Sequence, residues 1–215
     1  MTMNHVSNVN DMLLRVVLPY IPVMPMYQHL YGMSLKRGQQ KEINGYILRY
    51  HPQASVFSSV HQTGAVVLVG NAVNPFTGEL EQNIVDHFLA NEVGKLEDGR
   101  LRTELIDYVD QLTGRFRLMF IENGAVCALC DATALASLYF FQQDDSIYLS
   151  SHSQLLAETV GSERDSEVQE IIDSGFYSVG RKHLPGYKSP FKGIELLGAN
   201  VYISSLLKKS PNIPA

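Results

Sequence analysis

Short apolar runs alternate with polar turns through the second half of the chain. Four such runs are Arg115–Ile121, Ala125–Cys130, Leu138–Phe141 and Ile147–Ser150. Asn123-Gly124 follows the first run, and Asn-Gly between two apolar runs is a strong signal for a β-hairpin. The polar stretch Gln142–Asp145 joins the last two runs in a similar way. The pattern therefore predicts two β-hairpins in succession.

The first predicted strand also indicates which of its side chains share a face. Successive residues of a strand point to opposite faces, so Phe116, Leu118 and Phe120 should lie together. Arg117 and Met119 should lie on the other face. Because three large apolar groups mark a buried face, we expect the two phenylalanines and Leu118 to face the core between two sheets.

Two helices are predicted after the hairpins. Ser151 and Gln154 have the spacing of a capping box, and Gly161 is placed to end the helix that follows. Ser166 and Gln169 indicate a second capping box, at the start of a helix over 166–174. Gly175 is placed to end this helix.

The same periodicities assign the other elements. The predicted strands are 43–51, 55–61, 65–69 and 200–205, and the predicted helices are 79–91 and 101–112. Strands in consecutive blocks, with helices between the blocks, indicate an α+β protein and not a βαβ series. We divide the chain into a variable N-terminal segment with degenerate first strands (residues 1–40), a main domain (41–205) and a C-terminal tail (206–215).

Composition narrows the class of protein. The chain has 215 residues, of which 45% are hydrophobic and 18% charged, enough apolar material for one domain with a real core. The net charge of −5 argues against a nucleic-acid binder, which would need a basic face. No apolar stretch reaches the length of a membrane span, and no convincing signal peptide is present. We therefore expect no membrane association and a reducing, cytoplasmic location.

The order of short motifs in the second half is characteristic. Its residues are Leu112, Gly114 and Phe116, then Asp131, Leu138-Tyr139-Phe140 and Ser150-Ser151-His152, and finally Phe191–Leu197 and Asn200–Ile203. This order resembles the class II glutamine amidotransferase domain found at the start of asparagine synthetases. The resemblance covers roughly residues 43–205. It implies the N-terminal-nucleophile hydrolase fold, a four-layer α-β-β-α sandwich of two mostly antiparallel sheets.

The family's catalytic residues are largely missing from this sequence. The family attacks glutamine with an N-terminal cysteine, whereas this chain opens with Met1-Thr2. Thr2 could serve as a nucleophile in principle, but it stands in a polar stretch that we expect to be frayed. In the oxyanion motif Gly70 and Asn74 match the family, while Val69 replaces the asparagine that stabilises the oxyanion.

The family's substrate-holding motifs are also incomplete. Arg37-Gly38 echo only the start of one motif, and the acidic motif that grips the amine of glutamine has no counterpart near residues 79–84. We therefore regard Gly70 and Asn74 as vestiges of a substrate site.

The remaining candidate residues are interpreted as structural. Asp131 is expected to form a turn at a strand end, and Gly114 to meet a backbone demand. Cys127 and Cys130 form a Cys-x-x-Cys, but they should point to opposite faces of one strand, and no second pair of ligands accompanies them. We predict no metal and no cofactor.

These observations lead to a function that is not catalytic. The resemblance implies a degenerate amidotransferase-like domain that serves as a structural or docking module for an ATP-dependent, amide- or peptide-forming partner. Its contact site would include Leu206 and Leu207, an apolar pair with a basic rim, and the partner would be a synthetase-domain protein or a second copy of the chain. One alternative is a glutamine-hydrolysing subunit that donates ammonia to that partner. Another is an unrelated α+β binding domain.

Overall fold

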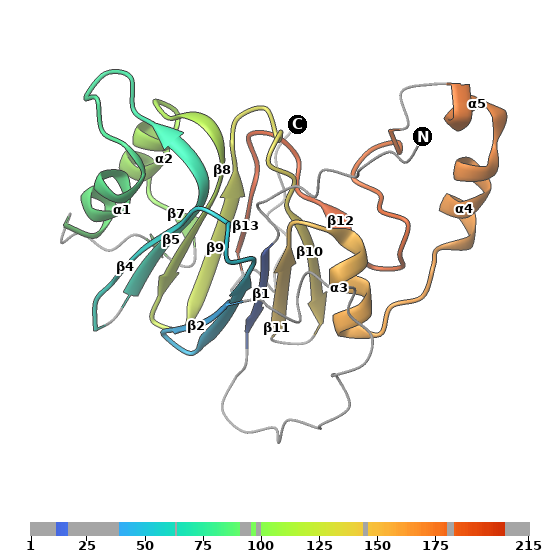
Figure 1. Ribbon diagram of the computed structural model, residues 1–215, viewed down its shortest axis with the longest axis horizontal. Coiled ribbons are helices and arrows are strands. Elements are labelled where there is room, and N and C mark those ends of the chain that lie inside the picture. Colours follow the sequence, from blue (N-terminus) through green and yellow to red (C-terminus); the bar gives the residue numbers. More distant parts are fainter. Residues whose placement is uncertain are drawn as a thin grey trace.

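The computed structural model describes residues 12–16, 39–62, 64–90, 96–97, 100–143, 146–179 and 183–204. Within these residues two large sheets stack on one another (Figure 1). Sheet A has the order β12-β10-β11-β1-β3-β2, and sheet B has the order β13-β9-β8-β5-β4. All pairings between neighbouring strands in these two sheets are antiparallel.

The strands of sheet A are β1 (Met12–Val16), β2 (Gln39–Ile43), β3 (Tyr46–Tyr50), β10 (Tyr139–Gln143), β11 (Ser146–Ser150) and β12 (Glu195–Leu196). Those of sheet B are β4 (Val56–Val60), β5 (Gly64–Val73), β8 (Thr113–Glu122), β9 (Ala125–Cys130) and β13 (Tyr202–Ser204). A small ribbon consists of β6 (Leu96–Glu97) and β7 (Arg100–Leu101). The helices are α1 (Glu81–Ala90), α2 (Thr103–Val109), α3 (Ser153–Val160), α4 (Ser166–Asp173) and α5 (Gly175–Val179).

Three apolar clusters define the layers. The first lies between the sheets and joins residues such as Leu48 and Leu149 of sheet A to Val67 and Met119 of sheet B. The second joins sheet B to α1 and α2, and the third packs α3 on the outside of sheet A. Figure 1 shows the corresponding order of helix, sheet, sheet and helix. The predicted α+β, α-β-β-α sandwich is therefore confirmed.

The two predicted hairpins are present, and a third was missed. Asn123 and Gly124 have φ angles of 50° and 80° and turn β8 into β9, as the Asn-Gly signal indicates. Asn44 and Gly45 have φ angles of 48° and 83° and turn β2 into β3. The prediction of one strand over 43–51 was wrong, because it overlooked the same dipeptide inside an apolar run.

Both predicted helix starts were off by one residue. His152, not Ser151, is the N-cap residue of α3, and its side chain makes no capping hydrogen bond. Asp165, not Ser166, caps α4 by accepting hydrogen bonds from two backbone N–H groups. Gly161 ends α3 in the left-handed conformation as predicted, with a φ of 70°. Gly175 does not end α4, because it is the first residue of α5.

Side chains of β8 alternate between its two faces as predicted, but each face meets the layer that was expected for the other. Phe116, Leu118 and Phe120 pack together in the cluster beneath α1 and α2, whereas Met119 belongs to the core between the sheets. The expectation that the phenylalanines fill the inter-sheet core was therefore wrong. Both faces of β8 are buried in a four-layer sandwich, so large apolar residues on one face do not reveal which layer they meet.

The predicted domain boundary and the predicted terminal residues can be located relative to the described elements. The boundary between residues 40 and 41 lies inside β2, and β1 of the N-terminal segment lies between β11 and β3 in sheet A. Thr2, Leu206 and Leu207 lie outside the described residues. In the described part of the chain, none of the helices combines the length and the apolar character needed to cross a membrane.

Candidate functional site

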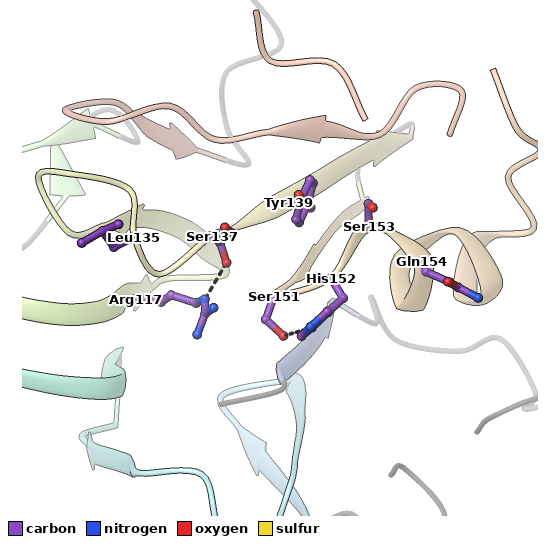
Figure 2. A pocket seen from close by; sticks show the side chains of 8 residues that line it. All are labelled: Arg117, Leu135, Ser137, Tyr139, Ser151, His152, Ser153 and Gln154. Carbon is purple, nitrogen blue, oxygen red and sulfur yellow. Dashed lines mark hydrogen bonds between the residues drawn. The ribbon is translucent and has the colours of Figure 1, made fainter. Parts of the chain in front are cut away.

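A polar cavity of about 350 Å³ lies at one end of the sandwich (Figure 2). Its wall comes from β8, from the loop that connects β9 to β10, from the start of β10, and from the segment where β11 ends and α3 begins. The described residues that line it are Arg117, Leu135, Ser137, Tyr139, Ser151, His152, Ser153 and Gln154. Leu13 of β1 is paired with Ser150, so the cavity lies at the end of sheet A where β1 begins.

Arg117 is the charged residue of this wall. It alternates with Phe116 and Leu118 along β8, and its side chain therefore points toward the space between the sheets. Only 4% of its surface is exposed. Its Nε donates a hydrogen bond to the backbone oxygen of Ser137 at 2.7 Å, which links β8 to the β9–β10 loop. A cation held in this way acts as a fixed positive charge at the cavity.

Ser151 and His152 form the opposite side. The Oγ of Ser151 and the Nδ1 of His152 are 2.9 Å apart, and either group can donate in that hydrogen bond, depending on the imidazole tautomer. The backbone N–H of His152 donates to the Oγ of Ser150 at 3.1 Å. Figure 2 shows Arg117, Ser137 and this hydroxyl–imidazole pair converging on the cavity from separate segments.

Asp131 shapes the loop that carries Ser137. Its Oδ1 accepts hydrogen bonds from the Thr133 hydroxyl at 2.6 Å and from the backbone N–H groups of Thr133 and Leu135. Its Oδ2 accepts one from the Ala136 N–H at 2.8 Å. Burial alone would raise the pKa of Asp131, but these hydrogen bonds together hold it below its ordinary value. The side chain thus has the geometry of the turn-former that the sequence predicts.

The two residues at the positions of the family's oxyanion donors, Val69 and Gly70, have structural roles in sheet B. Val69 is fully buried in the core between the sheets. The backbone N–H of Gly70 donates to the backbone oxygen of Ser55 at 2.9 Å. The two positions therefore present no hydrogen-bond donor to a substrate.

Asn74 is fully buried and engaged by the protein itself. Its Oδ1 accepts from the backbone N–H groups of Phe76 and Thr77, and its Nδ2 donates to Gln111 at 3.3 Å. These bonds fix the turn between β5 and α1. Asn74 is not among the residues that line the cavity, and neither is Gly70.

The two cysteines face different layers. Cys127 packs in the cluster beneath the helices, and Cys130 packs in the core between the sheets. Both are buried free thiols, and burial raises the pKa of each, to about 11 for Cys130. Among the described residues, no group of three or more histidine, cysteine or acidic side chains is arranged to hold a metal ion.

Comparison with known proteins gives distant likenesses to solved structures, with 17 matching chains. No model of a known protein family matches the chain, and no curated protein matches it. A solved structure of glutamine phosphoribosylpyrophosphate amidotransferase from B. subtilis, complexed with ADP and GMP, is 16% identical with a TM-score of 0.36. The match covers 54% of this chain but 29% of that one. At this TM-score the likeness carries no argument about function.

The cavity was not predicted from the sequence. Arg117 is the one signal that points to it, since it is the single charged residue in the buried run 116–121 of β8. The approach of His152 to the cavity depends on where α3 begins, and the sequence pattern misplaced that start by one residue. Long-range packing of three segments brings these residues together, and local patterns do not report it.

Proposed function

We propose that the chain is a catalytically degenerate amidotransferase-like domain that acts as a structural or docking module. Its partner would be an ATP-dependent, amide- or peptide-forming protein of the asparagine-synthetase type. The observation that supports this proposal best is the state of the oxyanion position. Val69 is apolar and buried, and the Gly70 N–H is already bonded to Ser55. An amidase needs donors aimed at the developing oxyanion. At these positions one donor is replaced by an apolar side chain, and the other is already bonded within the protein.

The acidic residues of the next segment support the same proposal. Glu79 accepts hydrogen bonds from Tyr108 at 2.6 Å and from Thr77 at 2.7 Å. Glu81 accepts one from Asn71 at 3.3 Å. These carboxylates hold α1 and α2 to the end of β5, so neither is positioned as a dedicated partner for the amine of free glutamine.

A glutaminase assay tests the absence of catalysis. We expect no release of glutamate from glutamine above a blank without protein, since loss of one oxyanion donor alone typically lowers a rate about 100- to 1000-fold. The Thr2→Ala variant should behave identically. Glutamate release by the wild type that Thr2→Ala abolishes would instead support a glutamine-hydrolysing, ammonia-donating subunit.

The docking role needs a test of its own. The candidate contact residues are Leu206 and Leu207, and the natural candidate partner is a neighbouring gene product that carries the family's pyrophosphate-binding loop. We expect co-purification with that protein, or a weak homodimer in sedimentation, and loss of either in Leu206→Asp/Leu207→Asp. Val179→Asp is the matched control, because Val179 is 89% exposed on α5. A strictly monomeric wild type that does not bind the partner would remove the docking role.

A further inference from the structure

We propose that the cavity beside Arg117 binds the carboxylate of a small organic acid. Its volume of about 350 Å³ is near the lower end of ligand sites in proteins. This space would suit a ligand the size of a short organic acid. Carboxylate binding at this place would hold whether or not the chain docks on a synthetase.

The charge of the lining favours an anion. The described lining residues include one arginine and one histidine, and none of them is an aspartate or a glutamate. Three serines and a tyrosine add hydroxyl groups that can donate hydrogen bonds. A guanidinium as deeply buried as that of Arg117 interacts more strongly with an anion than an exposed one does, because burial reduces screening by the solvent.

The start of α3 adds to this preference. The helix begins at Ser153, and the side chain of its N-cap residue His152 does not bond to the first helical N–H groups. Ser153 and Gln154, which line the cavity, are thus at the end of the helix where the backbone dipoles favour negative charge. The fixed cation and the helix end act in the same direction from opposite walls.

The chemistry of the wall favours a carboxylate over a phosphate. Phosphate sites commonly combine several cations or a nest of backbone N–H groups, matching a charge near −2. Among the described lining residues, one guanidinium, one imidazole and several hydroxyls suit a single negative charge. Leu135 and Tyr139 also line the cavity and offer apolar surface to a short carbon chain. We therefore expect butyrate to bind better than acetate.

The wild-type protein provides the first test. Butyrate and its neutral isostere butyramide would each be titrated into the protein, while backbone amide resonances are followed by NMR. We expect saturable shifts with butyrate, centred on Ser151–Gln154, and no saturable shifts there with butyramide. Equal responses to both compounds would overturn the proposal. So would shifts confined to other parts of the chain, or displacement of butyrate by an equal or lower concentration of inorganic phosphate.

Variants test the assigned residues. Arg117→Gln should weaken butyrate binding at least roughly tenfold, because a charge-assisted hydrogen-bonding pair is lost. Arg117→Lys should recover part of the affinity. Arg102→Gln, a change just before α2, is the matched control and should bind like the wild type.

Arg117 is buried, so its replacement could prevent folding, and Ser151→Ala is the second variant for that case. It removes one hydroxyl from the wall and should weaken butyrate binding several-fold. Wild-type affinity in a folded Arg117→Gln protein, or in Ser151→Ala, would contradict the assignment.

Discussion

Gly70 and Gly114 hold β5 and β8 together through a reciprocal close approach. Gly70 has a φ of 111° and Gly114 a φ of 134°, values that side chains rarely permit. A Cβ on Gly70 would overlap the backbone oxygen of Arg115, and a Cβ on Gly114 would overlap the backbone oxygen of Asn71. Each glycine therefore gives the opposite strand room for its carbonyl, which explains Gly70 without reference to a substrate.

The glycine pair predicts a large loss of stability in Gly70→Ala or Gly114→Ala. Gly124→Ala is the control, since Gly124 also has a positive φ, of 80°, but nothing lies within 4 Å of its Cβ position. We expect the control to lose about 1–2 kcal/mol from left-handed backbone strain alone. The Gly70 and Gly114 variants should lose roughly twice that or more, because steric overlap adds to the strain. Urea unfolding measures all three, and equal losses would contradict the close approach.

Phe116→Ala should destabilise the protein by roughly 3–5 kcal/mol, the usual cost of deleting a buried phenyl ring. Phe116 is 1% exposed and packs beneath α1 and α2, whereas Phe76 is 79% exposed in the turn before α1. Phe76→Ala is thus the same chemical change without the burial, and it should alter the free energy of unfolding by less than about 0.5 kcal/mol. A small effect at Phe116 would show that this face of β8 is not a core.

Local sequence signals predicted most elements of the fold. Asn-Gly turns and strand alternation identified the hairpin of β8 and β9, because these signals act over a few residues. The choice of layer did not follow, since β8 is buried on both faces and Phe116 and Met119 are equally apolar. The start of α3 was also misplaced, because Ser151 carries a good capping side chain but bonds to His152 instead.

The candidate site was less accessible to sequence reasoning than the fold. The sequence indicated what Val69 cannot do, since valine has no donor for an oxyanion. It did not indicate that Arg117 lines one cavity with Ser137 and His152, which are 20 and 35 positions further along the chain. Such a meeting depends on the stacking of the two sheets and on the path of the β9–β10 loop. Asp131 fixes that path with four hydrogen bonds.

Both cysteines should resist alkylation in the native protein. The thiolate is the reactive form, and burial raises the pKa of Cys130 to about 11 and that of Cys127 still further. Iodoacetamide at pH 8 should therefore leave the folded chain unlabelled over a time in which the unfolded chain takes up two labels. Mass spectrometry would count the labels on the chain in the absence and in the presence of denaturant. Rapid labelling of either thiol in the native protein would reopen a redox or metal-binding role for this Cys-x-x-Cys.

Asp131 should make the fold sensitive to acid. Its folded-state pKa is below the unfolded value of about 3.9, so the carboxylate stabilises the fold fully above that value. This contribution is lost as the pH falls through the folded-state pKa. Asp131→Asn should lose about 2–3 kcal/mol at pH 7, because an amide cannot accept all four hydrogen bonds. Its stability should then change less than that of the wild type below about pH 4.

Urea unfolding between pH 7 and pH 2.5 would measure this difference, with Asp107→Asn as the control for removal of an exposed carboxylate from α2. The control should retain the acid sensitivity of the wild type, since the four bonds of Asp131 remain in place. Parallel pH profiles for wild type and Asp131→Asn would show that the carboxylate is not the group that titrates. The β9–β10 loop, and with it the Ser137 oxygen that holds Arg117, would then owe its shape to backbone packing and not to Asp131.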